Sequence, residues 1–140
     1  MAHIVVLGAG IGGMSMAYEM KEQARPGDRV TVISKDAHFH FVPSNPWVAV
    51  DWRKRKDIEV DPAVTLGRKG IDFIPVAARR VDPDNNRVLL EDERVVEYDY
   101  LVIATGPKLA FDEIPGLGPH SGFTQSVCHV DHAETAEQAW

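Results

Sequence analysis

Three glycines near the start of the chain have the spacing of a loop that binds phosphate. Gly8, Gly10 and Gly13 follow the apolar run His3–Leu7 and precede a segment whose apolar residues recur at helical spacing. In such a loop the first glycine permits a tight turn, the second lets a pyrophosphate approach the backbone, and the third lets the helix pack closely on the strand. The free N–H groups at the start of the helix then face the phosphates. A flexible glycine loop without a ligand is the alternative, and the strand and helix on either side argue against it.

The elements around this loop predict a strand–helix–strand unit. The expected elements are a strand at His3–Leu7, a helix at Met14–Gln23, a turn at Arg25–Asp28 and a strand at Arg29–Ser34. This order implies parallel strands joined by a right-handed crossover.

The rest of the chain predicts a third strand, an inserted meander and a fourth strand. The expected elements are a short helix at Val64–Lys69, a strand at Ile71–Val76, antiparallel pieces at Ala77–Val81, Arg87–Leu90 and Val95–Tyr98, and a strand at Tyr100–Ala104. Asp131 is the expected N-cap of a last helix that is still running at Trp140. The fold class is therefore α/β: a Rossmann-like domain, a parallel sheet with helices, with a three-stranded antiparallel β-meander inserted at about residues 76–98. Because the last helix has no stop signal, we expect residues 1–140 to be the N-terminal part of a larger protein.

Charge and composition exclude several classes of function. Fifteen Lys and Arg against 21 Asp and Glu give a net charge of −6, which argues against a nucleic-acid partner. No apolar run is long enough to cross a membrane, and the first residues lack the basic start of a secretory signal peptide. Cys128 is the one cysteine, so an intrachain disulfide framework is excluded.

The position expected to bind the ribose departs from the usual pattern. An acidic residue commonly follows the second strand there. In this chain Ser34 and Lys35 take that place, and Asp36 comes later. A serine hydroxyl binds a ribose hydroxyl more weakly than a carboxylate does, so the pattern is not typical of a plain NAD-binding domain.

Histidines and basic residues offer weaker signals. His38, His40, His120, His129 and His132 do not show three ligands in an obvious metal pattern, so we predict no metal site. The basic run at residues 53–56 is interpreted as a solvated loop, with contact to anionic lipid headgroups as the alternative. The aromatic residues at positions 39, 41, 47 and 52 are interpreted as core or as the wall of a cofactor pocket, with a quinone contact also open.

Longer motifs resemble a known family. The order of glycine loop, meander and Ala104-Thr105-Gly106 is similar to that of flavoproteins with two dinucleotide-binding domains. The stretches Phe41–Val48, Ala104–Leu109, Gln125–Cys128 and Val130–Glu134 resemble sulfide:quinone oxidoreductases, and the likeness covers nearly the whole chain. Taken singly, the Ala-Thr-Gly tripeptide is also compatible with an ordinary turn after a strand.

The resemblance implies FAD as the cofactor and an enzyme that oxidises hydrogen sulfide at cysteine, passes two electrons to FAD and reduces quinone. It implies that Gly8, Gly10, Gly12 and Gly13 hold the pyrophosphate. Ser34 and Lys35 would lie at the adenosine ribose, and the backbone at Ala77 and Ala78 would contact the adenine side. Pro43, Ser44 and Asn45 would lie near the isoalloxazine ring, and Thr105 and Gly106 would form a closing loop over the nucleotide site. Cys128 matches the first of three family cysteines and is the catalytic candidate. A lone thiol cannot complete a disulfide cycle, so the chain by itself is expected to be inactive. For the isolated chain we interpret Cys128 as a partly buried thiol without a redox partner.

The resemblance also sets the expected partners and the rival functions. Sulfide and quinone are the implied substrates, and the implied location is peripheral to the bacterial cytoplasmic membrane, through regions outside this chain; a homo-oligomer stays open. The rivals are a type 2 NADH:quinone dehydrogenase or a ferredoxin reductase of the same superfamily, and a stand-alone nucleotide-binding module.

Overall fold

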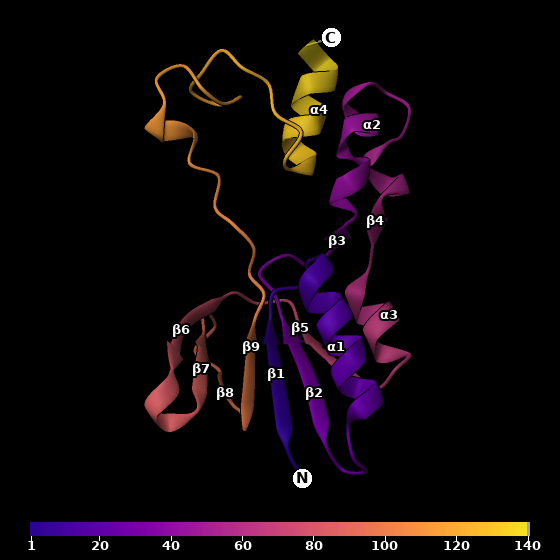
Figure 1. Ribbon diagram of the computed structural model, residues 1–140, viewed down its shortest axis with the longest axis vertical. Coiled ribbons are helices and arrows are strands. Elements are labelled where there is room, and N and C mark those ends of the chain that lie inside the picture. The colour runs from indigo at the N-terminus through magenta and orange to yellow at the C-terminus, as the bar shows by residue number, and fades with distance from the viewer. Residues whose placement is uncertain (140) are drawn as a thin grey trace. The chain divides into compact units, whose positions relative to one another are not determined.

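The computed structural model describes residues 1–139 and divides the chain into two compact units. The first unit is Met1–Phe39 with Asp61–Gly106, and the second is His40–Val60 with Pro107–Trp140. The expectation that the last helix still runs at Trp140 lies outside the described residues. The elements are coloured along the chain in Figure 1.

The first unit is built on a parallel sheet of four strands. The strands are β1 (His3–Leu7), β2 (Arg29–Ile33), β5 (Asp72–Ile74) and β9 (Tyr100–Ile103), in the order β5-β2-β1-β9. Helix α1 (Ile11–Gln23) connects β1 to the parallel strand β2. The predicted strand–helix–strand unit and the parallel sheet are thus confirmed.

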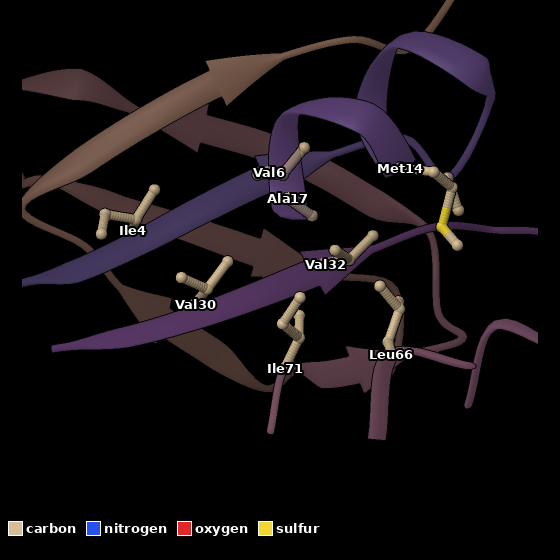
Figure 2. Close-up of a cluster of buried hydrophobic side chains, with 9 residues drawn as sticks. Ile4, Val6, Met14, Ala17, Val30, Val32, Leu66 and Ile71 are labelled. Atoms are coloured by element: carbon tan, nitrogen blue, oxygen red, sulfur yellow. The ribbon is translucent and has the colours of Figure 1, made fainter. Parts of the chain in front are cut away.

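Both faces of this sheet are buried, which explains why β1 is an unbroken apolar run. Ile4 and Val6 belong to one core cluster and Val5 and Leu7 to another, because successive side chains of a strand point to opposite faces. Figure 2 shows the first cluster, to which the neighbouring helices contribute Met14 and Ala17 from α1 and Leu66 from α3 (Pro62–Gly67).

The second face of the sheet packs against the predicted meander. Its strands are β6 (Ala78–Asp82), β7 (Arg87–Leu90) and β8 (Val95–Glu97), which pair antiparallel in that order (Figure 1). Val88 and Leu90 of β7 are buried in the cluster with Val5 and Leu7. The short 3-10 turn η3 (Pro83–Asn85) links β6 to β7 and ends at Asn86, whose φ of 51° is left-handed. The meander prediction is confirmed.

Helix α1 starts earlier than the apolar spacing predicted. It begins at Ile11, not at Met14, so Gly12 and Gly13 form its first turn. Glycine has a low helix propensity, which hid this turn from the sequence pattern. The glycine loop therefore runs directly into the first turn of α1.

The second unit holds most of the structure that the sequence pattern missed. Its elements are β3 (Phe39–His40), which begins at the last residue of the first unit, η1 (Val42–Ser44), α2 (Asn45–Ala49), η2 (Arg55–Asp57), β4 (Glu59–Val60), η4 (Phe111–Glu113) and α4 (Val130–Ala139). These pieces are too short for a periodic pattern. Val48 and Ile58 pack against Val130 and Ala133 of α4, so the core of this unit joins segments far apart in the sequence.

The N-cap prediction for α4 is wrong. The helix begins at Val130, with Ala133 N–H donating to the His129 carbonyl at 3.0 Å, so Asp131 lies inside the first turn. Its carboxylate accepts a hydrogen bond from Arg55, a tertiary contact that replaces the capping role. Within residues 1–139, no helix combines the length and the apolar character needed to cross a membrane.

Candidate functional site

The glycine loop and the end of β9 are in backbone contact. A Cβ placed on Gly8 would lie 2.3 Å from the Ala104 carbonyl oxygen, and Gly8 has a φ of 101°. A Cβ on Gly13 would lie 1.9 Å from the Gly8 carbonyl oxygen. Real side chains do not approach so closely, so these two positions require glycine. The turn, the helix and the Ala104-Thr105 strand end are therefore packed without room for side chains.

The other two glycines of the loop face open space. A Cβ on Gly10 or Gly12 would meet nothing within 4 Å, and both residues are exposed. Gly10 is the N-cap of α1 and makes no side-chain capping bond, and the first turn contains no acidic residue. The first N–H groups of a helix lack partners within the helix and carry its positive end. This open, uncapped helix start fits a pyrophosphate.

The residues predicted for the ribose follow the carboxyl end of β2, and those predicted for the closing loop follow the carboxyl end of β9. The glycine loop follows β1, which lies between these two strands. Ser34 follows β2; its N–H donates to the Ile74 carbonyl at 3.1 Å, and its Oγ accepts a hydrogen bond from the Asp36 N–H at 3.3 Å. Lys35 is exposed. Ligands of open α/β sheets bind at this end of the strands.

The closing loop follows β9. Thr105 and Gly106 are exposed, and the φ of 74° at Gly106 needs glycine. Ala104 N–H donates to the Leu7 carbonyl at 2.8 Å, which continues the β1–β9 pairing to the loop. Ala104, which packs on Gly8, was not among the predicted site residues; the Ala-Thr-Gly motif itself was the signal for it.

Ala77 and Ala78 open the meander. The Ala77 carbonyl accepts a hydrogen bond from the Glu91 N–H at 3.0 Å, and Ala78 pairs with Leu90 at a register shift. Ala77 is half-buried and Ala78 is exposed. Both side chains are single methyl groups, so they add little bulk at the start of β6.

In the second unit the predicted residues Pro43, Ser44 and Asn45 have different surroundings. Pro43 is exposed, whereas Ser44 and Asn45 are 0% exposed. Asn45 Nδ2 donates to the Val127 carbonyl at 2.9 Å, across 82 positions of sequence, and Asn45 Oδ1 is buried without a partner. The structure thus brings α2 together with the segment that carries Cys128.

Arg53 supports the same segment and was missed by the sequence pattern. Its Nη1 donates to Ser44 Oγ at 2.8 Å, and its guanidinium lies 3.9 Å from the centre of a Trp47 ring. A cation over an indole face is attracted by the ring quadrupole. No signal in the basic run distinguishes this arginine from its neighbours.

Cys128 is exposed. Its N–H donates to Ser126 Oγ at 3.2 Å. The thiol therefore lies at the surface of the second unit, two residues before α4. This position differs from the partly buried one expected for an inert thiol.

Arg55 binds two acidic residues of α4. Its Nη1 contacts Asp131 and Glu134, the latter at 3.0 Å, and its Nε lies 3.5 Å from Glu59. The hydrogen bond from Arg55 lowers the pKa of Asp131 below its ordinary value. Lys54 also pairs with Asp51 and with Glu137 of α4. These basic side chains therefore serve contacts within the chain, which weakens the lipid-headgroup interpretation.

Three histidines gather around the start of α4. The His132 ring lies 5.2 Å from His120, 5.7 Å from His129 and 5.5 Å from Phe111, measured between ring centres. Burial, together with the nearby charges of His120 and His129, lowers the pKa of His132. Among residues 1–139 no group of three His, Cys, Asp or Glu has the geometry to hold a metal ion.

A cavity of about 840 Å³ lies away from the glycine loop, at the amino ends of the strands. His3, Arg29 and Asp72 are among its lining residues. Its polar groups bond to one another: His3 Nε2 lies 2.8 Å from Thr31 Oγ1, and Arg29 lies 3.0 Å from His3 Nδ1. Burial lowers the pKa of His3. The cavity is separate from the candidate cofactor site.

The fold and the glycine loop indicate the class of protein to which this chain belongs. The chain belongs to the pyridine nucleotide-disulphide oxidoreductase family, whose model matches residues 2–140. It is 41% identical over 131 residues to the sulfide-quinone reductase of Aquifex aeolicus, covering 94% of this chain and 29% of that protein. It is 31% identical over 134 residues to external NADH-ubiquinone oxidoreductase 2 of Saccharomyces cerevisiae, covering 89% of this chain and 24% of the relative. The chain thus spans about three tenths or less of the length of these relatives.

A solved structure agrees with the sequence comparison. The crystal structure of the sulfide:quinone oxidoreductase from Aquifex aeolicus superposes with a TM-score of 0.89 at 39% identity, covering 99% of this chain and 31% of that one. The predicted resemblance to the N-terminal portion of sulfide:quinone oxidoreductases is therefore confirmed. FAD is the cofactor of these flavoproteins. The open glycines and the uncapped start of α1 fit its pyrophosphate.

Proposed function

We propose that this chain is the N-terminal FAD-binding part of a sulfide:quinone oxidoreductase, peripheral to the bacterial cytoplasmic membrane. The observation that carries the proposal is the glycine loop packed on Ala104 with its outer face open, in a chain 41% identical to a sulfide-quinone reductase. We further propose that residues 1–140 form one part of a divided FAD domain.

In this proposal each predicted residue has a physical task. Backbone N–H groups at Gly10, Gly12 and the first turn of α1 bind the pyrophosphate, while Gly8 and Gly13 permit the packing that positions them. Ser34, Lys35, Ala77 and Ala78 lie at the adenosine, and Thr105 with Gly106 closes the nucleotide site. Pro43, Ser44 and Asn45 lie near the flavin ring. Bound there, FAD would supply the two-electron redox chemistry that links a sulfide donor to a quinone acceptor.

Cys128 is proposed to handle sulfur in the full-length enzyme. Its exposed position supports this role, because a thiolate must reach a sulfur species to react with it. Since the oxidation of sulfide at a disulfide needs a second thiol, the role depends on further cysteines outside this chain. Sulfide and quinone are the proposed substrates, and the contact with the membrane would come from regions outside residues 1–140.

The decisive experiment compares electron donors in the full-length enzyme. Purified enzyme is mixed with a soluble quinone and either sulfide or NADH, and quinone reduction is followed by absorbance. We expect sulfide to support turnover and NADH not to. Turnover with NADH alone would refute the proposal and favour the NADH:quinone dehydrogenase function.

The NADH-dependent function remains the second candidate because a relative named as an NADH-ubiquinone oxidoreductase is 31% identical. Ser34, in place of the usual acidic residue after β2, is the feature of this chain that disfavours a plain NAD-type ribose site. A stand-alone nucleotide-binding module would be favoured by a natural gene that encodes these 140 residues and no more.

A further inference from the structure

Asn45 is the polar side chain through which α2 contacts the cysteine-bearing segment. It is 0% exposed, and its Nδ2 donates to the carbonyl of Val127, the residue before Cys128. Its Oδ1 is buried without a hydrogen-bond partner. The amide therefore makes one directional bond in a place where its second polar atom is unsatisfied.

Burial of an amide with one unpaired polar atom, as at Asn45, lowers the stability of the fold. A buried polar atom without a partner loses its hydration and gains nothing in return. Leucine, which branches at Cγ as asparagine does although it is larger, would carry no unsatisfied polar atom at the start of α2. The presence of asparagine here is explained by the bond to Val127, because an apolar residue cannot provide it.

The cysteine-bearing segment is held on both sides of Cys128. On the downstream side Val130 is 2% exposed and packs with Val48 and Ile58. On the upstream side the bond from Asn45 to the Val127 carbonyl is the contact to α2. Cys128 lies between these two anchors with its side chain exposed. Loss of the Asn45 donor would release the upstream side alone.

We infer that Asn45 is a positioning residue that fixes the Cys128 thiol by holding the Val127 carbonyl. The inference deepens the proposed function, on which the sulfur chemistry of Cys128 rests. Asn45 does not act on the sulfur itself. It reduces the range of positions that the thiol can take relative to α2, which is the usual way in which a supporting residue assists a reactive one.

The test places a nitroxide spin label on Cys128, the one cysteine of the 140-residue chain. The label's mobility is measured by electron paramagnetic resonance in the unchanged chain and in Asn45→Asp, Asn45→Leu and the control Asn86→Asp, with circular dichroism as a check of folding. At pH 7 we expect both Asn45 variants to increase the mobile fraction by roughly fivefold, the effect of losing one hydrogen bond. The control changes an exposed asparagine of the meander and should match the unchanged chain.

The pH dependence separates positioning from simple packing. A protonated carboxyl group can again donate to the Val127 carbonyl, and burial raises the pKa of such a group. We therefore expect the mobility in Asn45→Asp to fall back as the pH is lowered from 7 toward 4.5, whereas Asn45→Leu stays mobile. Unchanged mobility in both variants, or no recovery in Asn45→Asp, would overturn the inference.

A measurement on the unchanged chain covers the case in which the variants fail to fold. Nuclear magnetic resonance should show the side-chain NH₂ protons of Asn45 exchanging with solvent at least about tenfold more slowly than those of exposed Asn86, because buried hydrogen-bonded protons are protected. Equal exchange rates would overturn the inference. None of these measurements uses flavin, sulfide or quinone, so their failure is distinct from failure of the proposed function.

Discussion

Gly12 and Gly13 are adjacent in the first turn of α1 and differ in the space around them. A Cβ on Gly13 would lie 1.9 Å from the Gly8 carbonyl oxygen, while a Cβ on Gly12 would meet nothing within 4 Å. Substitution of each by alanine therefore compares a blocked and an open position in the same helical turn. The same chemical change should have opposite effects on stability.

The magnitude follows from the geometry. The contact at Gly13→Ala is about 1.5 Å short of an ordinary C···O contact of roughly 3.4 Å. The backbone fixes the position of the Cβ, and the oxygen is itself a backbone atom, so neither can rotate away. Overpacking typically costs about 1–3 kcal/mol, and we expect the upper end, about 3 kcal/mol. At Gly12→Ala the gain in helix propensity is up to about 1 kcal/mol. The free energies of unfolding of the two variants should then differ by about 4 kcal/mol.

Urea unfolding of the chain, followed by circular dichroism, measures both effects. We expect a lower midpoint for Gly13→Ala and an equal or higher midpoint for Gly12→Ala. If Gly13→Ala unfolds at the same urea concentration as the unchanged chain, the packing argument is wrong. An equal decrease of the urea midpoint in Gly12→Ala and Gly13→Ala would contradict the view that one face of the glycine loop is open.

Further predictions concern the second unit and the reaction. Arg55→Met should lower the free energy of unfolding by about 1 kcal/mol at low salt. The loss should be smaller in high salt, because the Arg55 side chain is 37% exposed and salt screens its pair with Asp131. The control Lys56→Met, at an exposed neighbour, should change the free energy of unfolding by at most about 0.5 kcal/mol. In the folded chain the pKa of His132 is lowered from 6.5, so the unfolded chain binds a proton at this imidazole more readily. The stability that the neutral ring contributes is therefore complete above about pH 6.5 and is lost as the pH falls through the lowered pKa. Urea midpoints between pH 5 and 8 should therefore fall less on acidification in His132→Phe, and identical pH profiles would contradict this. In the full-length enzyme Cys128→Ser should remove sulfide-dependent quinone reduction while the flavin spectrum is kept; unchanged turnover would exclude the cysteine. The isolated chain should bind FAD weakly and show no sulfide:quinone turnover, and cysteine-dependent turnover in it would refute that expectation.

Local features of the first unit could be predicted because their physical cause is local. The apolar run of β1 indicates a strand buried on both faces, and the glycine spacing indicates a turn that leads into a helix. The meander was predictable because turn residues such as Pro83 and Asn86 separate its short strands. The first turn of α1 was missed because Gly12 and Gly13 are poor helix formers; in the structure Met14 N–H donates to the Gly10 carbonyl at 2.9 Å, and Gly13 packs against Gly8.

The sequence by itself determined the kind of fold, the glycine loop and the family, because spacing, alternation and motif order are written along the chain. The motif spacing already assigned Gly13 to close packing, and the tertiary structure identified the obstructing group as the Gly8 carbonyl oxygen. Tertiary structure alone decided that Asn45 faces Val127 and that Arg55 holds Asp131. These contacts join residues 82 and 76 positions apart. No local pattern encodes them, because they form only when α2 and α4 share one core.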